Sequence, residues 1–145
     1  MIPQTPMKGS IVVDGKASSL EGFCKQILDQ LGRRRFSEQD QFAVHLALEE
    51  AFNNAVEHGN RGDPAKTVQV DYAVDDRRIE IRMTDQGNGF EPRKVADPRL
   101  DENILQARGR GLLLMRAYMD TVEYNSQGNS VHMVRSRRDP LHGAP

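Results

Sequence analysis

Two polar side chains one helical turn apart, Glu50 and Asn54, are the residues of this sequence best placed to do chemistry together. Residues four apart in a helix lie one above the other, so the carboxylate and the amide would share one patch of surface. Ala47 and Ala51 beside them leave room for a ligand to approach. The competing interpretation is a helix whose C-terminal half emerges into water with its polar side chains solvated.

A short glycine-containing motif, DQGNGF at residues 85–90, follows a predicted strand. An aspartate that leaves a strand, here Asp85, can accept a hydrogen bond from an amine in a pocket. Gly87 and Gly89 let the backbone come close to a ligand because they have no Cβ. An ordinary turn would show the same pattern. A calcium loop is disfavoured because the bidentate glutamate and the spaced carboxylates are missing.

A second glycine pair, Gly109 and Gly111 around Arg110, opens a predicted helix. The free N–H groups and the dipole of a helix start attract phosphate, although glycine is common at helix starts. The loop at residues 85–108, between the two motifs, has the length of a lid or a binding loop. It carries four cationic side chains that can meet anionic oxygens: Arg93, Lys94, Arg99 and Arg108.

The common nucleotide-binding codes are excluded. No GxxxxGK[ST] occurs, and neither glycine pair completes GxGxxG after a strand in a βαβ unit. The sequence therefore predicts neither a Walker-type nor a Rossmann site.

Composition excludes further classes of protein. The chain has 20 Lys and Arg against 21 Asp and Glu, and this net charge of −1 argues against nucleic-acid binding by bulk charge. Cys24 is the only cysteine, so an internal disulfide and a cysteine-built zinc site are excluded and a reducing compartment fits best. Apolar runs such as residues 112–115 fall far short of the roughly 18 residues that cross a bilayer. No signal peptide is recognisable, and we expect a soluble cytoplasmic protein.

The length of 145 residues and the 37% hydrophobic content predict one globular domain over residues 1–145, with loose ends at about 1–7 and 140–145. A short strand is expected at residues 11–13. Ser18 and Glu21 form a capping signature for a helix over residues 19–31, which Gly32 would stop.

A long helix is expected to begin after the cap at Ser37 and to end at Gly59. Residues 67–74 and 78–84 alternate as an antiparallel hairpin, residues 111–119 form a helix, and residues 121–125 and 130–136 form a second hairpin. This order predicts an α+β fold, a two-layer sandwich with helices on one face of a mixed, mostly antiparallel sheet. The apolar stripe of the long helix should face the core: Val44, Leu48, Ala51, Phe52 and Ala55.

Taken in order, the three motifs resemble the N, G1 and G2 boxes of the ATP-binding superfamily that includes gyrase, histidine kinases and mismatch-repair ATPases. Within it the chain is similar to the stand-alone anti-sigma factor serine-protein kinases. That closer likeness covers about residues 18–137. It rests on ALEEAFNNAVEHGN (residues 47–60), the following GDPAK, DQGNGF, GRGLLLMRAYMD (residues 109–120) and the closing hairpin.

The resemblance implies a Bergerat-type ATP-binding fold and a role for each matching residue. Asn54 matches the asparagine that ligates Mg²⁺, and Glu50 the carboxylate used as catalytic base. Asp85 matches the aspartate that reads the exocyclic amine of adenine. Two sets of glycines complete the site: Gly87 and Gly89 line the base, and Gly109, Arg110 and Gly111 form the hinge that closes on the phosphates.

Three residues close to Glu50 and Asn54 in the sequence have no assigned role. Asn53 and His58 stand at motif positions, and a histidine at a helix end is more often packed than active. Glu49 competes with Glu50 on residue type, but its 100° offset places it off the stripe that carries Asn54.

By this resemblance the protein is an ATP-dependent serine kinase that phosphorylates a small anti-sigma-factor antagonist and sequesters a sigma factor in a partner switch. The resemblance also implies a homodimer, which an apolar edge strand at residues 11–13 supports. No contact with nucleic acid or membrane is expected.

The alternative from another class is a nucleotide-gated binding module without kinase activity. A pure binder needs no base, so Glu50 beside Asn54 favours the enzyme. A plain structural domain would require three motif coincidences. The sequence shows no linked phospho-acceptor helix, which argues against a histidine kinase. It shows no second domain, which argues against a gyrase-like machine. The residues do not identify the partners.

Overall fold

The architecture is that of a computed structural model, which describes residues 4–87 and 111–138. The elements in chain order are β1 (Met7–Val13), α1 (Ala17–Arg33), α2 (Glu38–Asn53), the π-helix η1 (Asn54–Gly59), β2 (Val68–Val74), β3 (Arg78–Asp85), α5 (Gly111–Tyr118), β4 (Thr121–Tyr124) and β5 (Ser130–Ser136). No helix in these two ranges is both long and apolar enough to cross a membrane.

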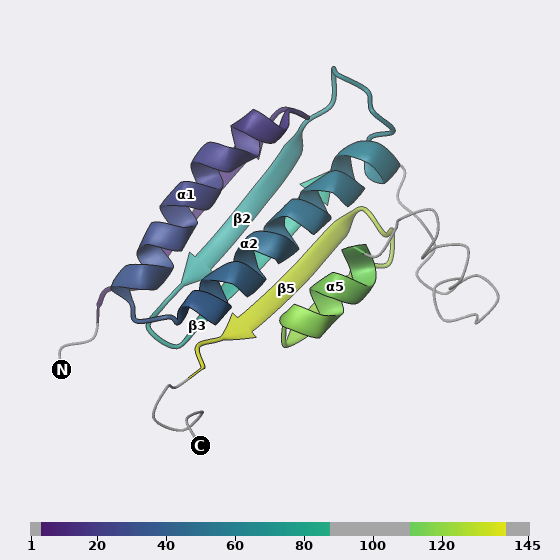
Figure 1. Ribbon diagram of the computed structural model, residues 1–145. Coiled ribbons are helices and arrows are strands. Elements are labelled where there is room, and N and C mark those ends of the chain that lie inside the picture. Colours follow the sequence, from purple (N-terminus) through teal and green to yellow (C-terminus); the bar gives the residue numbers. More distant parts are fainter. Residues whose placement is uncertain (1–3, 88–110, 139–145) are drawn as a thin grey trace.

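The strands form a five-stranded sheet in the order β1-β2-β3-β5-β4. Each neighbouring pair runs antiparallel, in agreement with the mostly antiparallel sheet expected, and the described strands include no parallel pair. Figure 1 shows α1, α2 and α5 lying side by side across one face of the sheet. The α+β sandwich predicted from the order of elements is therefore confirmed. The first strand begins at Met7, earlier than residue 11, because it pairs with the full length of β2.

The core lies between the helices and the sheet. The predicted stripe of the long helix is buried, with exposed fractions from 0% at Val44 and Leu48 to 6% at Ala55. It meets alternate residues of the strands, among them Val70, Ile81 and Met133. The period-3.6 and period-2 patterns therefore converge on one apolar layer.

Both predicted ends of α1 are wrong. Ser18 does not cap the helix. Instead Asp14 Oδ1 accepts hydrogen bonds from Lys16 N at 2.9 Å and from Ser19 Oγ at 2.6 Å, which fixes the first turn. At the other end the helix continues past Gly32 to Arg33. The left-handed residue that a glycine would usually supply is Arg35, with φ of 65°.

The start of α2 is as predicted. Ser37 Oγ accepts from Asp40 N at 3.0 Å, while Asp40 Oδ2 accepts from Ser37 N at 3.0 Å, which forms a capping box. The helix also ends at Gly59 as predicted, but its last six residues form η1, closed by the bond from Asn60 N to Ala55 O at 2.7 Å. Such π turns often mark functional sites.

A buried ion pair ties the far ends of several elements together. Asp40 is 0% exposed, and its Oδ1 lies 2.9 Å from Arg135 Nε and 2.8 Å from Arg135 Nη2. Arg135 Nη1 donates to the carbonyl oxygen of Tyr118, the last residue of α5. Asp40 Oδ2 also accepts from Arg138 N at 3.2 Å. The start of α2, strand β5 and the end of α5 therefore share one hydrogen-bonded centre.

We predict that Asp40→Ala lowers the free energy of unfolding by about 3–5 kcal/mol, because it leaves the Arg135 guanidinium buried without its carboxylate and also opens the capping box with Ser37. Asp29→Ala is the matched control, since Asp29 pairs with Arg33 at 3.0 Å on an exposed surface. An exposed pair contributes about 0–1 kcal/mol. Urea unfolding of both variants measures the difference. Equal losses in the free energy of unfolding would show that the buried pair stabilises the fold no more than the exposed pair does.

Candidate functional site

The predicted site residues that the structure describes lie where α2 passes into η1, where β3 ends and where α5 begins. A small hollow there is lined by side chains and backbone from η1, β3, β4 and the β4–β5 turn, including Asn54, Asp85, Tyr124 and Asn129. A larger hollow on the uncovered face of the sheet, lined partly by Asp71, holds none of the predicted site residues. The two hollows therefore differ in location, and of the two only the smaller one is lined by predicted site residues.

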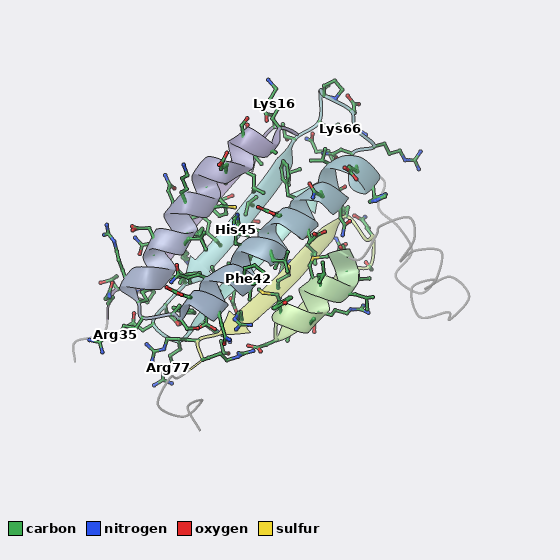
Figure 2. The ribbon with its side chains drawn as sticks, viewed as in Figure 1. Lys16, Arg35, Phe42, His45, Lys66 and Arg77 are labelled. Carbon is green, nitrogen blue, oxygen red and sulfur yellow. The ribbon has the colours of Figure 1, made fainter. Side chains whose placement is uncertain are left out.

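The site lies at one end of the molecule. Figure 2 shows Lys16 and Lys66 near the end at which η1 stops, and Arg35 and Arg77 at the opposite end. The loop that carries Lys66 joins η1 to β2, so it borders the site. The buried ion pair of Asp40 lies toward the other end, where α2 begins.

Glu50 and Asn54 meet the start of α5. A Cβ built on Gly111 would lie 2.6 Å from Glu50 Oε2 and 3.6 Å from Asn54 Nδ2. Any larger residue at position 111 would therefore push the Glu50 carboxylate aside. The structure thus brings together a carboxylate, an amide and a helix start that are far apart in the sequence.

Asn54 is buried, and one of its hydrogen-bonding atoms is not paired within the described part of the chain. It is 6% exposed, and among the described residues its Nδ2 has no hydrogen-bond partner. A buried polar atom without a partner costs about 1–3 kcal/mol. The amide can rotate to present Oδ1 instead, an oxygen ligand of the kind that Mg²⁺ prefers. The residue therefore fits a magnesium ion that takes its other ligands from phosphates and water.

The described residues contain no group of three or more His, Cys, Asp or Glu that could hold a metal ion. Within residues 4–87 and 111–138, a metal site built on such side chains alone is therefore not formed. A site in which Asn54 supplies one oxygen ligand to a nucleotide-bound ion is compatible with this arrangement.

Glu49 points to a different surface from Glu50. Its Oε1 lies 2.9 Å from His45 Nε2, and both side chains are exposed. Figure 2 shows His45 on the side of α2 that faces α1. Glu49 and Asn53 line a groove between these two helices rather than the hollow beside Asn54. The helical offset thus separates the two neighbouring glutamates.

The same groove contains Cys24, which is 2% exposed. Burial, together with the nearby carboxylates of Glu49 and Glu21, raises the pKa of the Cys24 thiol to about 11. The thiol is therefore protonated at neutral pH. It has none of the thiolate character that a nucleophile needs.

Asp85 is packed against the end of η1. The carboxylate is nearly buried, and its Oδ1 accepts from Gly87 N at 2.8 Å. A Cβ on Gly59 would lie 2.1 Å from Asp85 Oδ2, and a Cβ on Gly87 would lie 1.7 Å from the Gly59 carbonyl oxygen. Only glycine at both positions lets these backbones approach. The sequence indicates Gly59 only as a helix end and gives no sign of this close approach.

Several predicted site residues lie outside the described ranges: Gly89, Gly109, Arg110 and the cationic residues Arg93, Lys94, Arg99 and Arg108. His58 is half-buried within η1.

Comparison with known families gives one match across most of the chain. Residues 15–135 match the histidine kinase-like ATPase domain family. This range contains Glu50, Asn54, Asp85 and both glycine motifs.

Individual relatives are serine kinases. The chain is 30% identical over 139 residues to the serine-protein kinase RsbW of Listeria monocytogenes serovar 1/2a, covering 91% of this chain and 83% of that protein. It is 28% identical over 116 residues to the serine/threonine-protein kinase BtrW of Bordetella bronchiseptica, covering 78% of each. It is 33% identical over 107 residues to RsbW of Bacillus licheniformis, covering 69% of this chain and 67% of that protein.

A solved structure shares the fold. It contains the RsbU and RsbW domains of Rv1364c from Mycobacterium tuberculosis, with a TM-score of 0.59 and 18% identity. The match covers 94% of this chain and 33% of that chain. At this identity the likeness concerns the arrangement of helices and strands.

We predict that Gly59→Ala destabilises the protein by about 1–3 kcal/mol, because its Cβ would overlap the Asp85 carboxylate. Gly22→Ala is the control, since nothing lies within 4 Å of a Cβ at that position in α1. Alanine there should stabilise the helix by about 0.5–1 kcal/mol. Thermal unfolding compares the two variants, and a stabilised Gly59→Ala would mean that the close approach is not required.

Proposed function

The chain belongs to the histidine kinase-like ATPase domain family and, within it, to the anti-sigma factor serine-protein kinases, and on that basis we propose that it is an ATP-dependent serine kinase. Its proposed substrate is a serine of a small anti-sigma-factor antagonist, and the unphosphorylated antagonist competes with a sigma factor for this chain. The convergence of Glu50, Asn54 and the start of α5 is the observation that carries the proposal.

Phosphoryl transfer requires that the phosphate be positioned, its charge neutralised and the attacking hydroxyl oriented. We assign Glu50 as the general base that accepts the proton of the substrate serine. Asn54 would hold Mg²⁺ through Oδ1, and the ion when bound would neutralise negative charge on the phosphates. Gly111 begins α5, and the free N–H groups of such a helix start favour phosphate oxygens. Together with Gly111, Gly109 and Arg110 would form the hinge that closes on the phosphates.

Adenine recognition is assigned to Asp85, with Gly87 and Gly89 along the base. A carboxylate accepts hydrogen bonds only, so it favours the 6-amine of adenine and repels the 6-carbonyl of guanine. The bond from Gly87 N to Asp85 Oδ1 supports this assignment because it holds the carboxylate in one orientation.

The proposed partners are the antagonist, a sigma factor or an equivalent target, and a second copy of this chain, all in the cytoplasm. Strand β1 lies at the edge of the sheet, and Val12 on it is 64% exposed. Among the described residues the outer edge of β1 has no partner strand, and such an edge with an exposed apolar residue supports a homodimer. Light scattering should give about twice 16.3 kDa at micromolar concentration, whereas a value near 16.3 kDa would contradict the dimer.

Substitutions at Glu50 and Asn54 should separate chemistry from nucleotide binding. Glu50→Gln keeps the size of the side chain but cannot accept the serine proton, so transfer should slow by about 10²–10⁴-fold while ATP affinity stays within a few-fold. Asn54→Ala removes an oxygen ligand, so both ATP affinity and transfer should fall. The assay follows transfer of the γ-phosphate to the cognate antagonist, with ATP binding measured on the same samples.

Glu49→Gln is the control for this experiment because Glu49 contacts His45 on the α1 side of the helix. It should transfer phosphate at the wild-type rate. If Glu50→Gln does so as well, the base lies elsewhere. If the wild type binds ATP and a partner but phosphorylates no antagonist, the protein is a nucleotide-gated binding module.

Asp85→Asn should lower ATP affinity by about five- to 150-fold and abolish the preference for ATP over GTP. The new amide keeps an oxygen for Gly87 N but can turn a donor toward the adenine amine, and an opposed polar contact costs about 1–3 kcal/mol. Calorimetry with both nucleotides measures this effect. Equal ATP affinity in the wild type and the variant would remove Asp85 from the site.

A further inference from the structure

A buried amide next to the site has no role in the proposed function. Asn60, the residue after η1, is 2% exposed. Its Nδ2 donates to Thr67 O at 3.0 Å, and its Oδ1 accepts from Gln86 N at 2.7 Å. Gln86 Oε1 in turn accepts from Thr67 N at 2.7 Å. These three bonds form a closed triangle that joins the end of η1, the start of β2 and the end of β3.

The triangle lies one residue away from the contact that shapes the site. Asn60 follows Gly59, and Gln86 follows Asp85. The Gly59 backbone and the Asp85 carboxylate are themselves in contact, as the position of a Gly59 Cβ shows. The bond between Asn60 and Gln86 therefore links the two chain segments immediately beyond this contact, and a shift in either would change the distance between Gly59 and Asp85.

We propose that Asn60 is a positioning residue that sets base selectivity, because its amide holds the Asp85 carboxylate at the depth and angle that adenine requires. This inference rests on the proposed function, in which Asp85 reads the adenine amine. Asn60 itself is 2% exposed, so it would act without contacting the nucleotide. It acts through the backbone of Gln86 and the contact between Gly59 and Asp85.

A side chain that serves only the stability of the fold would behave differently. Its loss would leave the affinities for ATP and GTP unchanged or weaken both alike. Misplacing Asp85 instead weakens ATP selectively, since guanine gains nothing from that carboxylate. The ratio of the ATP and GTP affinities is therefore the measurement that separates a positioning role from a structural one.

The test compares Asn60→Ala with Asp75→Ala. Asp75 Oδ1 accepts from the backbone N–H groups of Arg77 and Arg78 in the turn between β2 and β3, at the opposite end of the same two strands. Each variant therefore loses two hydrogen bonds of one hairpin. Calorimetry with Mg-ATP and with Mg-GTP gives the affinity ratio, and thermal unfolding gives the stability of each variant.

We expect Asn60→Ala to reduce the ATP-over-GTP preference on the order of tenfold or more, because small displacements of a positioned group have large effects. Its GTP affinity should stay within a few-fold of the wild type. Asp75→Ala should keep the wild-type preference. An unchanged preference in a folded Asn60→Ala protein overturns the proposal, as does an equal loss of both affinities.

A second variant keeps the test decisive if Asn60→Ala does not fold. Asn60→Ser keeps a polar group at the buried position, but its shorter side chain cannot span both Thr67 O and Gln86 N. A smaller loss of preference in the same direction supports the proposal, and an unchanged preference overturns it.

Asp85→Asn distinguishes the two levels of inference. If Asp85→Asn abolishes the preference and Asn60→Ala leaves it intact, the positioning role alone is wrong. If the wild type shows no preference, or Asp85→Asn leaves it unaltered, the adenine-reading role of Asp85 fails, and the role of Asn60 fails with it.

Discussion

The contact between the Gly59 backbone and the Asp85 carboxylate is the constraint on which the site depends. It brings the end of a helix against the end of a strand that lies 26 residues further along the chain, closer than any side chain at position 59 would allow. The π turn of η1 delivers Gly59 to this point, and the Gly87 backbone N–H holds the carboxylate there. The shape of the proposed nucleotide site therefore depends on this close approach of backbone and carboxylate.

Helix α5 connects this site to the opposite end of the molecule. Its first residue, Gly111, abuts Glu50, and the carbonyl of its last residue, Tyr118, accepts from Arg135. With eight residues it spans roughly 12 Å. The positive charge of the Arg135 guanidinium at the C-terminal end of α5 interacts favourably with the helix dipole, in addition to the hydrogen bond that it donates to the Tyr118 carbonyl oxygen. A buried ion pair at one end thereby fixes a helix whose other end borders the proposed catalytic base.

Local signals in the sequence were enough to predict most elements and the pairing of Glu50 with Asn54. The stripe through Val44 and Leu48, the cap at Ser37 and both hairpins depend on residues close together in the chain, and each was found from spacing alone. The ends of α1 were mistaken because Asp14 and Arg35 took roles usually filled by serine and glycine.

The roles of Gly59 and Asn60 escaped prediction for a different reason. Both depend on contacts with residues near the end of β3, 26 positions away, and no local pattern announces such contacts. The π turn was missed as well, since the sequence of residues 54–59 reads as ordinary α-helix. Residue types and spacing indicate the motifs and the family resemblance implies their roles, whereas the packing between them is seen only in the three-dimensional structure.

Because η1 is a π turn, the geometry of the site depends on the number of residues in that turn. A π turn contains more residues than an α turn, so the side chains after Asn54 are out of phase with those before it. Deleting one residue between positions 55 and 58 would restore the α-helical period and rotate Gly59 by about 100°. Every motif residue would remain, yet Asp85 would face a different part of the helix. An insertion or deletion in η1 would therefore disrupt the site even in a sequence that keeps every motif residue.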